Sequence, residues 1–252
     1  MRENFHRPKK ISSATQHDIK LELDVRCQQR IESILCRKFP SSAILGEEGV
    51  TGDLGADSRW VVDPIDGTVN FTYGIPHACV SIAFQRQRST SKAPARVLPP
   101  DDAYETVVGV VYDPFCDELW TAIRGGPARL NGRIIHASKR NKLTEAIVSI
   151  GFAKEKSTLE RMLPSFNQLI ERVRKMRIMG AAALSMVYVA SGRMDAYVEY
   201  GLRLWDIAAG GLILECAGGE FWRKPLDGEH AYQVIANNGL LRRQLMPFIR
   251  VD

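Results

Sequence analysis

Two aspartates at the end of an apolar run are the residues of this sequence best suited to chemistry. Asp63 and Asp66 follow the apolar residues 60–62 and lie within the sequence DPIDGT at positions 63–68. The proline stiffens this segment, and the glycine allows the backbone to approach a ligand closely. Two neighbouring carboxylates repel each other unless a cation lies between them, and Mg²⁺ prefers such oxygen ligands. The alternative is an ordinary turn, because Asp, Pro and Gly are also common turn residues.

Two further acidic segments favour a metal site over a simple turn. Glu47 lies upstream in the sequence GEEG, and Asp206 follows Trp205 far downstream. Hydrolysis of a phosphate monoester requires activation of water and neutralisation of phosphoryl charge, which a pair of metal ions about 3.5–4 Å apart supplies. Such a site needs carboxylates from several segments. Taken singly, Glu47 also fits a solvated loop, and Asp206 fits a helix N-cap, a role compatible with metal binding.

In this order the three acidic segments resemble the inositol monophosphatase family, whose members are magnesium-dependent, lithium-sensitive phosphatases. The resemblance extends over most of the chain. It implies that Glu47, Asp63 and the carbonyl of Ile65 hold one Mg²⁺ ion. It also implies that Asp63, Asp66 and Asp206 hold a second ion, and that a third, weaker one lies near Glu47.

The resemblance also assigns roles to residues around these ions. Glu47 and Thr68 would orient the attacking water, with Asp24 hydrogen-bonded to Thr68. The phosphate would rest on the backbone N–H groups of Gly67 and Thr68, at a helix start where anions are favoured. The sugar or polyol end of the substrate would meet six residues: Asp66, Gly180, Ala181, Ala182, Glu199 and Asp206. Read alone, Glu199 also fits an exposed strand residue.

The substrate class follows from the resemblance only in outline. The run DGTVNF at 66–71 resembles the inositol monophosphatase branch and favours a sugar or polyol monophosphate, inositol monophosphate first. Histidinol phosphate, fructose 1,6-bisphosphate and 3′-phosphoadenosine 5′-phosphate remain alternatives. A different kind of function is a regulatory protein that binds the transcription machinery, which the net charge of +5 suits. The intact carboxylate set argues against a purely non-catalytic role.

Composition sets the broader expectations. The 252 residues suffice for one large domain or for two that share a core, and no apolar run approaches the roughly 20 residues of a membrane span. The basic N-terminus lacks the apolar stretch of a secretory signal. The five cysteines include no CxxC pair, which favours free thiols in a cytoplasmic protein. The basic clusters lack interleaved aromatics, so nucleic acid is not an expected partner. A homodimer is expected from the resemblance alone.

Helices and strands alternate along the chain and must position these residues. We expect strands at 43–45, 60–62, 78–84, 107–112, 118–123, 146–150, 194–200 and 233–236. We expect helices from an Asp24 cap to 39 and at 157–175, 180–191, 204–217 and 240–249. The resemblance implies an α/β (α+β) sandwich of the sugar-phosphatase type, layered αβαβα. Residues 1–140 would form an α+β half with most metal ligands, and residues 141–252 an α/β half with substrate contacts and one ligand.

Two departures from the family pattern stand out. Ser13 occupies a position where the family often has a lysine, which leaves an outer contact to the third ion unassigned. Residues 86–104 are rich in Ser, Pro and charge and predict an exposed loop that is longer than usual. Neither departure removes a metal carboxylate.

Overall fold

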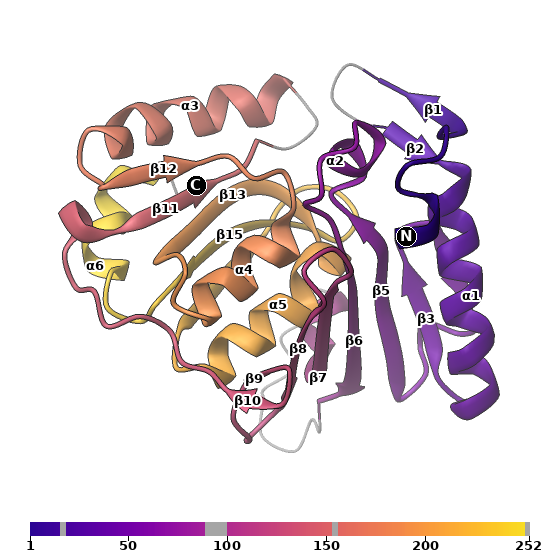
Figure 1. The fold of residues 1–252 in the computed structure, drawn as a ribbon. Coiled ribbons are helices and arrows are strands. Elements are labelled where there is room, and N and C mark those ends of the chain that lie inside the picture. The colour runs from indigo at the N-terminus through magenta and orange to yellow at the C-terminus, as the bar shows by residue number, and fades with distance from the viewer. Residues whose placement is uncertain (16–18, 89–99, 153–155, 250–252) are drawn as a thin grey trace.

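Two large β-sheets stack with helices between and outside them in the computed structural model, which describes residues 1–15, 19–88, 100–152 and 156–249 (Figure 1). Helix α1 (Glu22–Lys38) packs on the outer face of the first sheet. Helices α4 (Ala182–Ala190) and α5 (Leu204–Cys216) lie between the sheets. Helix α3 (Lys156–Ile170) and the short α6 (Arg242–Leu245) cover the far side of the second sheet. This order confirms the predicted αβαβα layering.

The first sheet carries the strand that ends in the aspartate motif. It has the order β10-β9-β8-β7-β6-β5-β3-β4, with β3 and β5 parallel and the other neighbours antiparallel. Its strands are β3 (Ala43–Gly46), β4 (Gly49–Thr51), β5 (Ser58–Asp66), β6 (Cys79–Gln87), β7 (Tyr104–Asp113), β8 (Glu118–Ile123), β9 (Arg129–Leu130) and β10 (Arg133–Ile134). Because β3 and β5 are parallel, their carboxyl ends meet at one edge of the sheet.

The second sheet contributes the remaining site residues. Its order is β12-β11-β13-β15-β14. Its strands are β11 (Ile147–Ile150), β12 (Lys175–Arg177), β13 (Ala196–Arg203), β14 (Glu220–Pro225) and β15 (Ala231–Asn237). A small antiparallel pair, β1 (Ile11–Ala14) and β2 (Ile19–Leu21), precedes α1. Across the described ranges, no helix is long and apolar enough to cross a bilayer.

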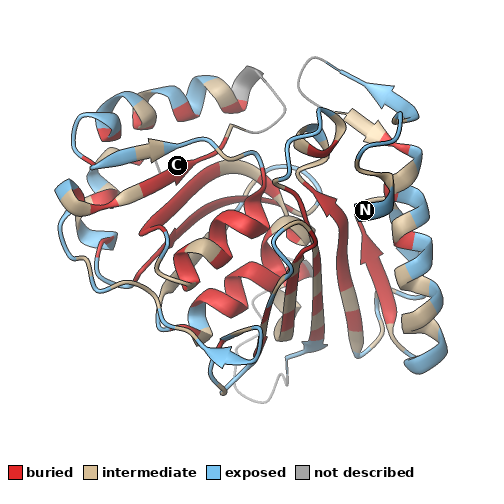
Figure 2. Ribbon diagram, viewed as in Figure 1, coloured by how far each residue is buried: buried red, intermediate tan, exposed pale blue. Residues whose placement is uncertain are grey.

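The layer between the sheets forms a continuous core. Helices α4 and α5 are buried along most of their length, as Figure 2 shows, and they join side chains of both sheets in one apolar cluster. Helix α5 lies so close to β7 that a Cβ on Gly109 would be 2.8 Å from the carbonyl oxygen of Ala209. The predicted boundary between the two halves, near residue 140, falls between the two sheets. Side chains of both halves form one core, so the division into two halves stays a prediction.

Several predicted boundaries differ from the structure. Strand β5 continues through the aspartate motif to Asp66, with an irregular register after Asp63, whereas the sequence predicted a loop there. The short strands β4, β12 and β14 were not predicted. The last predicted helix is reduced to α6 and a 3₁₀ turn at Met246–Phe248. Of the predicted loop at 86–104, residues 89–99 lie outside the described residues.

Candidate functional site

Glu47 and Asp63 lie side by side because β3 and β5 run in parallel. Gly46 pairs with Val62, and the backbone N–H of Glu47 donates to the Val62 carbonyl at 3.1 Å. The following turn is held by Gln28 of α1, whose Oε1 accepts from the N–H of Glu48 at 2.9 Å. Gln28 was not predicted as a site residue, since only the packing of α1 on the sheet brings it to this turn.

Asp206 approaches the same strand end from the N-terminus of α5. The Trp205 carbonyl accepts a hydrogen bond from Ser81 Oγ at 3.2 Å, and Ser81 is the cross-strand partner of Asp63. Asp206 was expected to serve as a helix N-cap as well. Instead Arg203 is the N-cap, and Asp206 is the third helical residue. From that position its Oδ2 accepts a hydrogen bond from the Arg203 N–H at 2.7 Å.

Asp66 ties the first sheet to helix α4. Its Oδ1 accepts from the N–H of Ala182 at 3.1 Å, and its Oδ2 accepts from the N–H of Ala183 at 2.8 Å. The predicted substrate-contact segment Gly180–Ala182 therefore lies beside Asp66. Ala183 was not predicted, although its N–H contributes the shorter bond.

Gly67 and Thr68 follow Asp66 and begin the short helix α2 (Thr68–Thr72). Gly67 is the N-cap in the left-handed region, at φ 89°, and its added Cβ would be 2.9 Å from the His77 carbonyl oxygen. The hydroxyl of Thr68 donates to the Ile65 carbonyl at 2.8 Å. Backbone N–H groups and a hydroxyl thus gather where the phosphate is expected.

Asp24 differs from its predicted arrangement in two respects. Helix α1 begins at Glu22, so Asp24 is its third residue and its Oδ2 accepts from the Leu21 N–H at 2.8 Å. The predicted hydrogen bond to Thr68 is not formed, because the threonine hydroxyl donates to Ile65 and Asp24 Oδ1 is buried without a hydrogen-bond partner. Burial, together with the charges of Glu47 and Glu48, raises the pKa of Asp24 to about 7.

Glu199 points inward from β13 and is buried, so its reading as an exposed strand residue is wrong. The hydroxyl of Tyr197, two residues earlier on the same face, donates to Glu199 Oε2. An added Cβ on Gly151 would fall 1.6 Å from that oxygen, so only glycine leaves room for the carboxylate. Burial raises the pKa of Tyr197, and the charges of Glu199, Asp66 and Asp206 raise it further. Tyr197 and Gly151 carried no sequence signal of this role.

Asp63 interacts with three other acidic side chains, and the chemistry of the four carboxylates fits hard cations. Burial raises the pKa of Asp63 well above its usual range, and the charges of Glu47, Asp66 and Asp206 raise it further. Among the described residues, no three His, Cys, Asp or Glu side chains form a ready-made ion cage. Like charges avoid closer approach when nothing neutralises them, whereas divalent cations with oxygen ligands would remove the repulsion. The donor set therefore fits Mg²⁺.

In the absence of divalent ions, we expect the stability of the protein to fall as the pH rises from about 4 to 7. The pKa values of Asp24 and Asp66 are raised to about 7 and about 6, mainly by burial, so the folded protein retains protons that the unfolded chain has lost. Thermal unfolding in EDTA across this range measures the effect. Asp24→Asn should flatten the decline, and a melting temperature that rises with pH in the unmutated protein would contradict the assignment.

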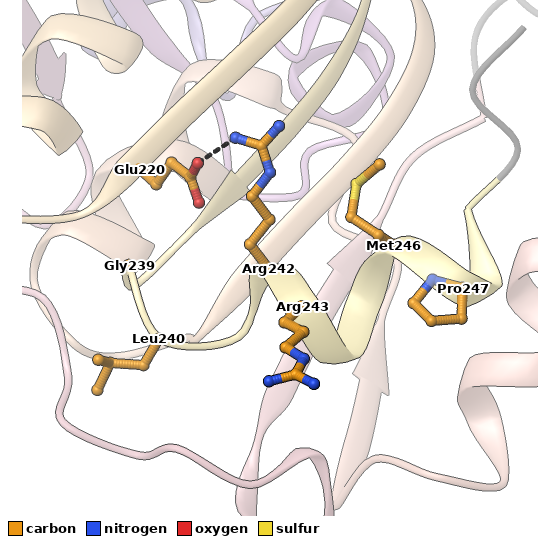
Figure 3. Close-up of a pocket in the computed structure, with 7 residues that line it drawn as sticks. All are labelled: Glu220, Gly239, Leu240, Arg242, Arg243, Met246 and Pro247. Atoms are coloured by element: carbon orange, nitrogen blue, oxygen red, sulfur yellow. Dashed lines mark hydrogen bonds and ion pairs between the residues drawn. The ribbon is translucent and has the colours of Figure 1, made fainter.

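A pocket of about 750 Å³ lies away from these carboxylates. It is lined by Glu220 of β14, Arg242 and Arg243 of α6, and the flanking residues Gly239, Leu240, Met246 and Pro247. Figure 3 shows that Glu220 pairs with Arg242, which satisfies part of the charge in the pocket. None of the predicted site residues lines this pocket, so it does not alter the assignment of the site.

The arrangement matches a known family. The model of the inositol monophosphatase family matches residues 1–93 and 102–246. Inositol monophosphatase 1 of Solanum lycopersicum is 37% identical over 227 residues, covering 87% of this chain and 77% of that protein. Nus factor SuhB of Pseudomonas aeruginosa is 39% identical over 208 residues, covering 80% and 71%.

Solved structures resemble the fold over nearly the whole chain. The extragenic suppressor protein suhB of Bartonella henselae superposes with a TM-score of 0.83 at 30% identity, covering 98% of this chain and 91% of that one. The IMPase of Thermotoga maritima gives a TM-score of 0.80 at 29% identity, covering 98% and 89%. The layered fold of this chain therefore recurs in these solved structures.

Proposed function

The chain belongs to the inositol monophosphatase family and is a phosphoric monoester hydrolase, and we propose that its substrate is a sugar or polyol monophosphate, inositol monophosphate first. The observation that carries this proposal is the interaction of the buried Asp63 with three other acidic side chains, so that carboxylates from three segments of the chain act together. Such a set is suited to positioning and charge neutralisation, which dominate phosphoryl transfer.

We propose that two or three Mg²⁺ ions bind at this carboxylate set. Glu47, Asp63 and the Ile65 carbonyl would hold one ion, and Asp63, Asp66 and Asp206 a second, with a third near Glu47. The Ile65 carbonyl already accepts from Thr68, and its second lone pair remains available to a cation. When bound, the ions would supply positive charge for the phosphoryl oxygens and Lewis acidity for the attacking water.

The protein's own groups then act on the substrate. Glu47 and Thr68 orient the water, whose oxygen bonds to phosphorus as the bond from phosphorus to the polyol oxygen breaks. The proton lost by the water ends on that polyol oxygen. The N–H groups of Gly67 and Thr68 hold the phosphate, and Asp24 lies buried at the start of α1, where its pKa is raised to about 7 in the metal-free protein.

The polyol end of the substrate would lie between the two halves. Gly180, Ala181 and Ala182 present backbone to it beside Asp66, and Glu199 accepts hydrogen bonds from ligand hydroxyls. Tyr197 supports this use of Glu199, since its phenol already fixes one carboxylate oxygen. A homodimer and lithium sensitivity, both from the family resemblance, complete the proposal, together with a cytoplasmic location that the free cysteines favour.

Phosphate release from a panel of esters tests the proposal. The panel contains inositol 1-phosphate, fructose 1,6-bisphosphate, histidinol phosphate and 3′-phosphoadenosine 5′-phosphate, each with Mg²⁺, with EDTA and with added Li⁺. We expect Mg²⁺-dependent, Li⁺-inhibited release that is fastest with inositol 1-phosphate. Fastest release from another ester would correct the substrate, and no release from any ester would refute the sugar-phosphatase proposal.

The relatives named Nus factor SuhB favour a second candidate function. In this role the chain is a regulatory protein that binds the transcription machinery. Asp63→Asn separates the two functions, because it removes a proposed metal ligand without changing the surface of the protein. Partner binding that survives this substitution would support the regulatory role alongside catalysis.

A further inference from the structure

A buried carboxylate outside the site joins the two sheets. Asp101 lies in the 3₁₀ turn Pro100–Ala103, and its side chain is only 6% exposed. It accepts hydrogen bonds from Arg59 Nη2 of β5 and from the hydroxyl of Tyr232 of β15, each at 2.8 Å. Its Oδ2 also lies 2.8 Å from His230 Nδ1. Burial raises the pKa of Asp101, but hydrogen bonds from His230, Tyr232 and Arg59 outweigh burial and lower this pKa to about 2.

His230 is held in an unfavourable backbone conformation. Its φ is 54°, in the left-handed region that non-glycine residues rarely adopt. Because an ionised carboxylate only accepts hydrogen bonds, the Nδ1 atom of His230 carries a proton and donates a hydrogen bond to Asp101. Backbone strain of this kind persists only where surrounding contacts enforce it, and the Asp101 bond is one such contact.

The turn that carries His230 supports the start of α5 in two places. The His230 ring contacts the Trp205 ring, with centroids 6.2 Å apart and planes inclined by 60°. The guanidinium of Arg203 donates from Nη1 to the Glu229 carbonyl at 2.6 Å. Arg203 is the N-cap of α5 and Trp205 is its second residue, so both contacts hold the helical turn that presents Asp206.

We propose that Asp101 and His230 form a positioning pair that fixes the first turn of α5, and thereby the Asp206 carboxylate, for Mg²⁺ binding. The inference rests on the proposed function, because it takes Asp206 as a metal ligand. The pair acts through Trp205 and does not contact the substrate. Outer partners of metal ligands typically contribute about 10–100-fold to metal affinity, since they fix the orientation of the ligand.

His230→Asn tests the pair with little disturbance of the backbone. Asparagine tolerates the left-handed region better than most residues, and the substitution removes the ring that contacts Trp205. We expect Mg²⁺ affinity, measured by isothermal titration calorimetry without substrate, to fall about 10-fold. Trp205→Ala should cause a similar loss, and the double variant should lose little more, because both substitutions remove the same contact.

Tyr232→Phe is the matched control. Its hydroxyl donates to the same Asp101 oxygen at the same 2.8 Å distance as His230, but Tyr232 lies on β15 rather than in the turn. This variant should keep wild-type Mg²⁺ affinity even if it loses stability. Affinity within twofold of wild type in a folded His230→Asn variant would overturn the positioning role. Failure of the unmutated protein to bind Mg²⁺ would instead overturn the proposed function, and the inference with it.

Discussion

Asp63→Asn is expected to lower kcat/KM for phosphate release by about 10³-fold or more and to stabilise the protein in the absence of metal. Asp63 is 1% exposed and interacts with three other carboxylates. Its charge would serve both proposed ions, so its removal costs transition-state stabilisation of about 4 kcal/mol or more. The same charge destabilises the metal-free fold, since burial and like charges oppose the ionisation of Asp63.

The two effects are measured separately. Steady-state phosphate release gives the catalytic loss, and melting temperatures in EDTA and in excess Mg²⁺ give the stability. We expect Mg²⁺ to raise the melting temperature of the unmutated protein but not that of Asp63→Asn, because an ion stabilises only a fold that binds it. Asp53→Asn, at an exposed turn aspartate, is the control. An Asp63→Asn variant with near wild-type activity would exclude Asp63 as a ligand.

Asp101→Ala is expected to destabilise the folded protein by about 3–5 kcal/mol in the absence of Mg²⁺. The substitution leaves the guanidinium of Arg59 buried, at 3% side-chain exposure, without its carboxylate. Removing one partner of a buried ion pair costs this much because the remaining charge is desolvated without compensation. Arg59 also donates to Gln85 and stacks on Tyr104, so it has little freedom to turn towards solvent.

Urea unfolding of the Asp101→Ala and Glu215→Ala variants compares the loss of a buried ion-pair partner with the loss of an exposed one. Glu215 pairs with Arg124 at 3.1 Å, but both side chains are more than a third exposed. Exposed pairs contribute about 0–1 kcal/mol, so Glu215→Ala should scarcely change the free energy of unfolding. Equal losses of unfolding free energy in the two variants would show that burial does not determine how much Asp101 contributes to stability.

The acidic segments could be recognised from sequence because their chemistry is local. Asp63 and Asp66 lie within one short motif, and the residue types in it suit cation binding whatever the exact backbone. The structure places Glu47 beside this motif through the parallel pairing of β3 and β5, and the start of α5 contacts Ser81 opposite Asp63. Metal binding by Glu47 and Asp206, which the family resemblance implied, stays a prediction. Which atom bonds to which is a matter of tertiary packing, and there the sequence reading of Asp24 was wrong.

The supporting residues carried no local signal. Gln28 and Gly151 are ordinary residues until the layers assemble, since each meets its partner only through packing between elements. Tyr197 meets Glu199 two residues along the same strand, but a tyrosine in a strand does not by itself indicate such a role. The helices α4 and α5 were predicted nearly to their ends because long apolar segments with small residues are distinctive. The short edge strands β4 and β14 are mixed in polarity, so their pairing depends on a neighbouring strand rather than on their own pattern.

The position of α5 between the two sheets has a consequence for the kinetics of folding. Asp63 lies in the first sheet and Glu47 in the turn after β3, whereas Asp206 arrives on a helix that must dock against both sheets. Contacts between such distant segments form late, because a long stretch of chain must first be ordered. A ligand that bridges them acts mainly on the rate of unfolding, since the transition state for folding lacks the bridge. Bound cations would thus prolong the lifetime of the native state rather than guide the chain towards it.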